Sequence, residues 1–204
     1  MTTAKPTVFV VDDDHAVRDS LQVLFKTVGI ESKAYGSADA FLSAYDSKQP
    51  GCLVLDVRMP GMDGVELQQH LISKRIAIPI IFVSGHGDIR MAVEAVQSGA
   101  VDFIEKPLRQ QVVLEQVRTA LAQDAESRRR QSERDTIEKR LSTLSVREQE
   151  VLSLIITGNH NKSIAAQLGI SHKTIESHRT NIMRKTEAQN TVHLLRMVST
   201  ASAN

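Results

Sequence analysis

Short apolar runs alternate with stretches of helical spacing along the first 121 residues of the chain. Runs rich in β-branched residues predict strands at residues 7–11, 32–35, 52–55, 79–83 and 101–104. Apolar residues three or four apart predict helices between them, at residues 17–28, 37–44, 64–73 and 89–98, and from residue 110 onward. Strands that alternate with helices indicate parallel βαβ units. We therefore expect an α/β fold, a flavodoxin-like, doubly wound, five-stranded parallel sheet over residues 1–121.

Residues 122–142 have a different pattern, with many charged residues, few apolar ones and neither Gly nor Pro. Opposite charges four residues apart, as in Glu126–Arg130 and Asp135–Lys139, favour a helix. We predict a long, charged helical linker that continues the helix starting at residue 110. A disordered tether is the alternative.

From residue 143 to residue 204 the apolar spacing is helical throughout. Caps and stops predict an all-α domain of four helices: Ser145 and Glu148 form a capping box, Gly158 and Gly169 end two helices, and Ser171 and Asn190 begin two more. We expect Val192, Leu195 and Val198 of the last helix to face inward. A Leu-Gly-Ile-Ser turn separates the second and third helices, which is the spacing of a helix-turn-helix.

Composition narrows the class of protein. Hydrophobic residues make up 41% of the chain, enough for a core, and the single Cys52 excludes a disulfide scaffold or a thiolate-rich zinc site. The absence of Trp and the 3% aromatic content argue against a surface that stacks bases or sugars. Long apolar runs are absent and an acidic triplet lies near the N-terminus. We therefore expect no membrane span, no secretory signal and a cytoplasmic location.

The formal net charge of +1 hides an asymmetry between the two ends. Residues 1–121 carry 12 basic and 15 acidic side chains, whereas residues 143–204 carry 7 basic and 4 acidic ones. An acidic part and a basic part joined by a charged connector suggest two functions. We expect one domain at residues 1–121, a linker at 122–142 and a second domain at 143–204.

Chemically capable side chains follow the predicted strands. Asp12 and Asp13 follow the first strand, Asp56 the third, Ser84 the fourth and Lys106 the fifth. These strand ends meet at one edge of a parallel sheet. Converging carboxylates need positive charge beside them, and a hard cation such as Mg²⁺ would supply it. One carboxylate could then attack a phosphoryl group. Each residue alone could be a cap or turn residue, the role we assign to Asp14, but together they predict a site.

The segments VFVVDDD, CLVLDVRMPGMDG, IIFVSGHGD and AVDFIEKP resemble the successive motifs of a response-regulator receiver domain, and the MPG and SGHGD turns are similar to its FixJ-like branch. The resemblance implies that a histidine kinase phosphorylates Asp56. It implies a Mg²⁺ site formed by Asp12, Asp13, Asp56 and the backbone carbonyl of Arg58. It also implies that Lys106 contacts the phosphoryl oxygens and that Ser84 and Phe103 form a switch. Taken alone, Ser84 could be a turn hydroxyl and Phe103 a core residue.

The segment LSVREQEVLSLIITGNHNKSIAAQLGISHKTIESHRTNIMRK resembles the LuxR/NarL/FixJ-type DNA-binding domain. The resemblance makes residues 172–185 the recognition helix. Its implied base contacts are Glu176, Ser177, Arg179 and Thr180, and its implied phosphate contacts are Asn161, Lys162, Lys173, Thr174, His178 and Lys185. Thr186 departs from the family pattern, which has an apolar residue there, and this questions the packing at the end of the helix.

Together the two resemblances imply a two-component transcriptional regulator that accepts a phosphoryl group and is not an enzyme. The implied partners are a sensor histidine kinase, double-stranded DNA, RNA polymerase and a second copy of the chain, with activation of transcription as the outcome. Three alternatives are an aspartyl-phosphate phosphatase, a constitutive DNA binder and an RNA antiterminator. Arg58, at the position of a phosphatase's acid/base Asp, disfavours the first. The intact acidic set disfavours the second and the helix-turn-helix the third.

Overall fold

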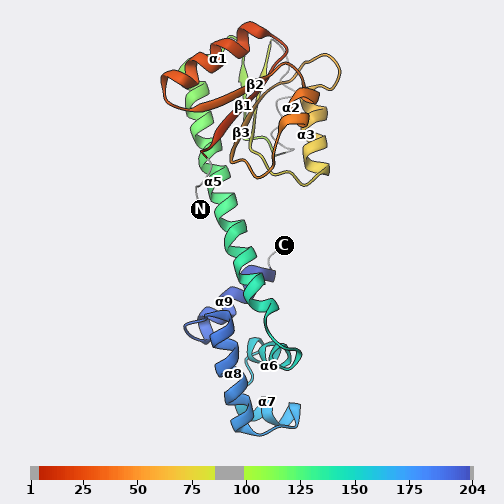
Figure 1. Ribbon diagram of the computed structural model, residues 1–204, viewed down its shortest axis with the longest axis vertical. Coiled ribbons are helices and arrows are strands. Elements are labelled where there is room, and N and C mark those ends of the chain that lie inside the picture. The colour runs from red at the N-terminus through yellow and green to blue at the C-terminus, as the bar shows by residue number, and fades with distance from the viewer. Residues whose placement is uncertain (1–4, 86–98, 203–204) are drawn as a thin grey trace. The chain divides into compact units, whose positions relative to one another are not determined.

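The computed structural model describes residues 5–85 and 99–202 of the chain. The chain divides into two compact units, Met1–Arg128 and Arg129–Asn204 (Figure 1). The helix predicted at residues 89–98 lies outside the described residues.

The described residues of the first unit form a parallel sheet of five strands in the order β2-β1-β3-β4-β5. The strands are β1 (Thr7–Val11), β2 (Glu31–Tyr35), β3 (Gly51–Asp56), β4 (Ile80–Ser84) and β5 (Asp102–Glu105). β1, β3 and β4 are buried along their whole length, as expected for strands covered on both faces. The strand order reverses between β1 and β3, which confirms the predicted doubly wound α/β fold.

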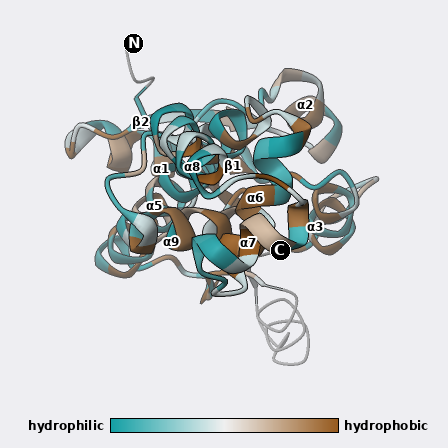
Figure 2. Cartoon of the chain, turned by 90° about the horizontal axis from the view of Figure 1, so that it is seen from below, coloured by the Kyte–Doolittle hydropathy of each residue, from teal (hydrophilic) through white to brown (hydrophobic). Residues whose placement is uncertain are grey.

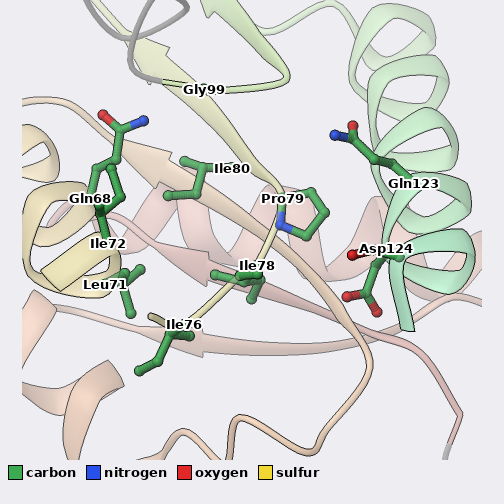
Figure 3. Close-up of a pocket in the computed structure, with 12 residues that line it drawn as sticks. Gln68, Leu71, Ile72, Ile76, Ile78, Pro79, Ile80, Gly99, Gln123 and Asp124 are labelled. Carbon is green, nitrogen blue, oxygen red and sulfur yellow. The ribbon is translucent and has the colours of Figure 1, made fainter. Parts of the chain in front are cut away.

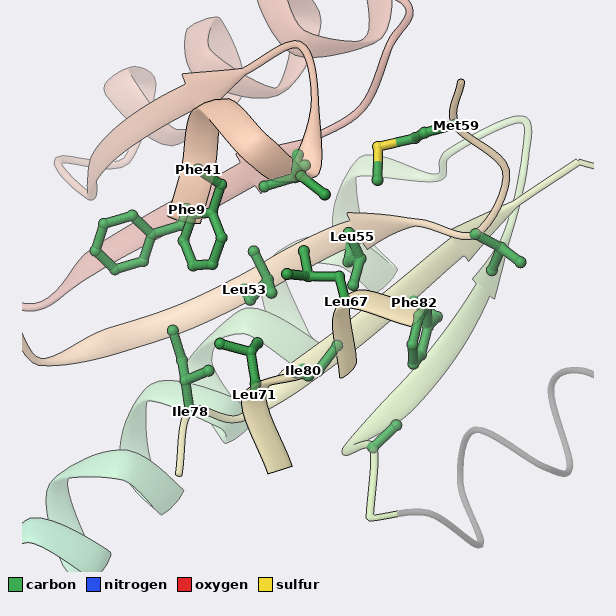
Figure 4. Packing of buried hydrophobic residues seen from close by; sticks show 14 residues of the cluster. Phe9, Phe41, Leu53, Leu55, Met59, Leu67, Leu71, Ile78, Ile80 and Phe82 are labelled. Atoms are coloured by element: carbon green, nitrogen blue, oxygen red, sulfur yellow. The ribbon is translucent and has the colours of Figure 1, made fainter. Parts of the chain in front are cut away.

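Helices cover both faces of this sheet. In the described part of the first unit they are α1 (His15–Thr27), α2 (Ala38–Ala44), α3 (Gly64–Ser73) and the start of α5 (Gln110–Ser142). Successive side chains of β1 point to opposite faces. Phe9 packs with Phe41 of α2 and Leu67 of α3, in the cluster drawn in Figure 4. Val10 packs on the other face, with Phe25 of α1.

The α5 helix is continuous through residues 122–142, which confirms the helical linker over the disordered tether. Its first turns supply Val113 and Val117 to the core of the first unit, and its last turns supply Ile137 to the core of the second. Most side chains between these positions are exposed. Asp124 differs, because it is only 2% exposed.

The described residues of the second unit form four helices after the end of α5. These are α6 (Val146–Ile156), α7 (Asn161–Leu168), α8 (His172–Thr186) and α9 (Thr191–Ser202). Ser145 and Glu148 form the predicted capping box, and Ser171 caps α8. Gly169 ends α7 in the left-handed region, with φ at 65°, so the turn from α7 to α8 is tight. These elements confirm the predicted helix-turn-helix.

The inward face of α9 differs from the prediction. Of the three predicted residues, Val198 is partly buried against the core and Leu195 is partly buried, but Val192 is 76% exposed. Leu194 and Met197, which were not predicted, are buried. The cap predicted at Asn190 is present, because Asn190 Oδ1 accepts a hydrogen bond from the backbone N–H of His193 at 2.8 Å. The difference lies in the face of the helix that packs inward, which contains Leu194 and, three residues later, Met197.

Thr186 is fully buried at the end of α8. Its hydroxyl donates to the carbonyl of Ile182 at 2.8 Å, so the polar group is satisfied inside its own helix. The departure from the family pattern therefore leaves no unpaired hydroxyl in the core.

Helices such as α3 and α7 carry both apolar and polar stretches, as amphipathic surface helices do (Figure 2). Among the helices that the structure describes, none has the length and apolar character needed to cross a bilayer.

Candidate functional site

The carboxyl ends of four neighbouring strands bring the predicted acidic site together. Asp12 directly follows β1, Asp56 ends β3 and Ser84 ends β4, while Lys106 directly follows β5. The strand register pairs Val11 with Leu55 and Asp56 with Val83, so these ends are level. The sheet therefore places residues up to 94 positions apart in the sequence at one edge.

Lys106 lies between two buried carboxylates. Its Nζ is 2.9 Å from Oδ2 of Asp12 and 2.7 Å from Oδ1 of Asp56. The carboxyl side chains are only 3% and 7% exposed, so charge–charge interactions here are much less screened than at the surface. The backbone N–H of Lys106 donates to the carbonyl of Ser84 at 2.7 Å, which fixes Lys106 to the end of β4.

The electrostatics of this cluster raise two pKa values. Burial raises the pKa of Asp56, the nearby charge of Asp12 adds to this, and the hydrogen bond from Lys106 partly opposes it. For Lys106, burial acts to lower the pKa, but the hydrogen bonds and charges of Asp56 and Asp12 together outweigh it, and the pKa is raised. The raised pKa of Lys106 favours its charged form, whereas the raised pKa of Asp56 disfavours its charged form.

The second carboxylate oxygen of Asp56 is also held. Oδ2 accepts from the backbone N–H of Arg58 at 2.9 Å. The chain then folds back over the end of β3, where Gly64 donates its N–H to the carbonyl of Val57 at 2.9 Å. A Cβ on Gly64 would lie 2.2 Å from the carbonyl oxygen of Asp56, so this close approach requires glycine. Gly64 was not among the site residues predicted from the sequence.

The loop after β1 carries the remaining acidic residues. Asp12 Oδ1 accepts from the backbone N–H of Asp14 at 2.9 Å, and Asp14 caps α1 through the N–H of Ala16, as predicted. Asp13 is exposed beside them. Arg18 reaches back from α1 to the carbonyls of both Asp12 and Asp13, a contact that the sequence analysis missed.

The donor set of this edge is compatible with a hard cation. In residues 5–85 and 99–202, no three His, Cys, Asp or Glu side chains already form a metal-binding group. What the structure does gather is carboxylate oxygen from Asp12 and Asp56, and the described hydrogen bonds of these carboxylates come from backbone N–H groups and Lys106, not from an imidazole or a thiol. Oxygen donors of this kind suit Mg²⁺, which retains several waters and takes few protein ligands.

The two predicted switch residues lie on neighbouring strands. Ser84 is 2% exposed at the end of β4. Phe103 is half-buried and packs at the edge of the cluster that contains Phe82, its partner in the β4–β5 register.

A cavity of about 230 Å³ lies apart from this edge, between α3, the segment before β4 and α5 (Figure 3). Apolar side chains such as Leu71, Ile72 and Ile76 line one side, and Gln123 and Asp124 line the other. None of the predicted site residues lines it, so the acidic edge and the cavity are separate features.

The predicted DNA-contacting residues lie at the start of α7 and along α8, with Lys185 in the last turn of α8. Lys162, Lys173, Thr174, Glu176, Ser177 and Thr180 are exposed, and Asn161, His178 and Arg179 are partly buried. Ile175 and Ile182 on the opposite side of α8 are fully buried. The helix therefore presents a polar face while its apolar face anchors it in the core.

Two of the predicted cationic contacts are engaged within the second unit. Nζ of Lys185 lies 2.7 Å from Oε2 of Glu148 and donates to the carbonyl of Thr143 at 3.2 Å. A phosphate contact at Lys185 would have to compete with this ion pair. Arg179 donates through Nη2 to Oγ1 of Thr191 at 3.1 Å, which holds its guanidinium against the start of α9.

Comparison with protein families agrees with this geometry. A family described as the response regulator receiver domain matches residues 8–118, more than half of the chain. The chain is a response regulator. A second family, described as bacterial regulatory proteins of the luxR family, matches residues 142–198.

Relatives of known name align with this chain along most of its length. The transcriptional regulatory protein FixJ of Rhizobium meliloti strain 1021 is 45% identical over 191 residues, 94% of each chain. Nodulation protein W of Bradyrhizobium diazoefficiens is 43% identical over 198 residues, 97% of this response regulator and 87% of that protein. The solved structure of the response regulator StyR has a TM-score of 0.88 at 44% identity and covers 96% of this chain, with 99% of its own chain matched. This response regulator is thus a two-component transcriptional regulator with a receiver domain and a LuxR-type DNA-binding domain.

Proposed function

We propose that Asp56 accepts a phosphoryl group from the phosphohistidine of a sensor histidine kinase and that this controls DNA binding. The observation that supports it is the position of Lys106 between the buried carboxylates of Asp12 and Asp56. In the transfer, a carboxylate oxygen of Asp56 forms a bond to phosphorus as the bond from phosphorus to the kinase imidazole nitrogen breaks. Lys106 then exchanges its contact with Asp56 for the oxygens of the new phosphoryl group.

Asp12, Asp13, Asp56 and the backbone carbonyl of Arg58 would hold Mg²⁺. When bound, the cation supplies positive charge that neutralises the phosphoryl oxygens. Lys106 supplies the rest of that charge, and the backbone N–H of Arg58 orients the acceptor carboxylate.

We propose that the switch acts through Ser84 and Phe103. The phosphoryl group draws the Ser84 hydroxyl toward itself, and the half-buried ring of Phe103 moves into the space that this change leaves. The altered face pairs two receivers, so that phosphorylation produces a homodimer.

The dimer then engages DNA through two copies of α8. Glu176, Ser177, Arg179 and Thr180 would face base edges, and Asn161, Lys162, Lys173, Thr174, His178 and Lys185 would contact phosphates. A single small domain makes few phosphate contacts, so pairing would supply much of the affinity. RNA polymerase would be the partner through which the bound dimer activates transcription in the cytoplasm.

In this proposal, residues 1–121 are the receiver, 122–142 the linker and 143–204 the DNA-binding domain. The receiver is expected to perform only slow self-dephosphorylation and no multiple turnover. A phosphatase would need a proton donor two residues after the nucleophile, and the guanidinium of Arg58 is not one.

Mass spectrometry after incubation with acetyl phosphate and Mg²⁺ tests the acceptor. The wild type is expected to gain one phosphoryl group on Asp56, and Asp56→Asn none. Asp39→Asn makes the same change at an exposed site on α2 and should label like the wild type. Equal labelling of Asp56→Asn, or steady release of phosphate over many turnovers, would contradict the proposal.

Sedimentation with Mg²⁺, with and without beryllofluoride as a stand-in for the aspartyl phosphate, tests pairing. The expected result is a monomer-to-dimer shift that Asp56→Asn abolishes. An unchanged mass in the wild type would contradict phosphorylation-driven pairing of receivers.

A further inference from the structure

Arg18 forms a bridge from α1 to the acidic loop. Its Nη1 donates to the carbonyl of Asp12 at 2.7 Å and to the carbonyl of Asp13 at 2.9 Å. Its guanidinium also lies against the loop after β2, because a Cβ on Gly36 would be 3.5 Å from Nη1. The group is therefore held between two loops at the carboxyl edge of the sheet.

The two acidic residues of the loop depend on this bridge to different degrees. Asp12 has further anchors, since its N–H donates to Tyr35 and its side chain accepts from Asp14 and from Lys106. In the part of the chain that the structure describes, the Asp13 carboxylate has no hydrogen-bond or ion-pair partner. The direction of Asp13 is thus set by its backbone, and Arg18 holds the carbonyl of that backbone.

We propose that Arg18 is a positioning residue that pre-organises the acidic loop for Mg²⁺. This inference rests on the proposed metal-dependent phosphorylation of Asp56. Groups that orient metal ligands without touching the metal commonly contribute about 10- to 100-fold to metal affinity. Within the described residues, the hydrogen bonds of Arg18 go to the backbone carbonyls of Asp12 and Asp13, so it would act through the placement of these two residues.

If Arg18 acted through its charge alone, its removal would have the opposite effect on Mg²⁺ affinity. Arg18 is a fixed cation close to the site of a dication, and its removal would tighten Mg²⁺ binding through reduced repulsion. If Arg18 positions the loop, its removal weakens binding. The sign of the change therefore separates the two roles.

Calorimetric titration with Mg²⁺ of the unphosphorylated full chain provides the test. Arg18→Gln is expected to bind Mg²⁺ about 10-fold more weakly than the wild type. Arg18→Lys keeps the charge but loses the planar fork, so it too is expected to bind more weakly. Arg118→Gln removes the same charge from an exposed position on α5 and should bind like the wild type.

Thermal unfolding without Mg²⁺ shows whether each variant is folded, and the increase of Tm on adding Mg²⁺ is a second measure of binding. Should Arg18→Gln fail to fold, Arg18→Lys carries the test with the same expected loss. Mg²⁺ affinity in the folded variants equal to or higher than that of the wild type would overturn the positioning role. No Mg²⁺ binding by the wild type itself would instead overturn the metal-dependent function on which the inference rests.

Discussion

Asp124 and Arg128 lie one helical turn apart on α5, and Arg128 Nε donates to both carboxylate oxygens of Asp124, each at 2.9 Å. The same carboxylate accepts from the backbone N–H of Gly51 at 2.9 Å, and Arg128 donates to the carbonyls of Ser47, Lys48 and Gln49. Both residues lie beyond the 8–118 match of the receiver family. They hold the continuation of α5 against the loop before β3 and the first residue of β3, and the first compact unit extends to Arg128.

The ion pair between Asp124 and Arg128 is predicted to stabilise the first unit. Asp124→Asn removes the charge that faces Arg128 in a buried position, and we expect a loss of about 2–3 kcal/mol in the free energy of unfolding. Urea unfolding followed by circular dichroism measures it. Glu115→Gln removes an exposed negative charge from the same helix and should change stability by less than about 0.5 kcal/mol. Equal effects of the two substitutions would show that Asp124 has no special role.

The raised pKa of Asp56 makes stability depend on pH in a defined direction. An acid whose folded pKa is above its unfolded value binds protons more tightly when folded, so its contribution to stability is full below the unfolded pKa and is lost as pH rises through the folded pKa. Asp56→Asn, which lacks this ionisation, should therefore be more stable than the wild type at neutral pH. The difference should shrink as pH falls through the folded pKa and should be lost below the ordinary Asp pKa of 3.8. Unfolding of both proteins across this range measures it, and a difference that grows in acid would contradict the assignment.

Glu148 of the second unit is predicted to behave in the opposite way. Its hydrogen bonds from Lys185 and from the backbone of Ser145 lower its pKa. The stability that it contributes is present above the unfolded value of 4.5 and is lost as pH falls through the folded pKa. Glu148→Gln should cost about 2 kcal/mol at neutral pH and less in acid.

The exposed Glu150 on the same helix provides the control for Glu148. It pairs with Arg147 at the surface, and Glu150→Gln should cost less than about 0.5 kcal/mol at any pH. A pH-independent loss for Glu148→Gln would indicate a packing defect in place of the ion pair.

Thr186 offers a test of how the core of the second unit accommodates its hydroxyl. Because the hydroxyl bonds to the carbonyl of Ile182 within the same helix, Thr186→Val should preserve shape and change stability by less than about 1 kcal/mol. Thr186→Ala leaves a cavity and should cost more than Thr186→Val. Thermal unfolding of the three proteins compares them. Both variants lose the hydrogen bond, so a larger loss for Val than for Ala would mean that the buried site does not accommodate a second methyl group.

Local signals in the sequence predicted most of the fold. The strands fall within one residue of the β-branched runs, and α3 begins at Gly64 because Asp63 caps it. The exposed position of Val192 was missed although the cap at Asn190 was predicted, because apolar residues fall at helical spacing both at 192, 195 and 198 and at 194, 197 and 198.

The candidate site could be predicted once the strands were placed, because the carboxyl ends of parallel strands meet at one edge of the sheet. The contacts that join Arg18, Asp124 and Arg128 to other elements could not be predicted, because they are made to backbone groups. The partners of Asp124 and Arg128 lie more than 70 residues away along the chain. Every residue has a backbone carbonyl, so residue type does not indicate which carbonyl a distant side chain will contact. Such contacts are found only in the folded structure.

If phosphorylation of Asp56 controls DNA binding, the affinity of the protein for DNA changes when the site is occupied. An electrophoretic titration measures that affinity. The probe is a double-stranded DNA selected from a random-sequence pool by the protein with Mg²⁺ and beryllofluoride. We predict that beryllofluoride raises the affinity of the wild type and of Asp39→Asn about 10-fold and leaves Asp56→Asn unchanged. Equal affinity of the wild type with and without beryllofluoride would contradict the account.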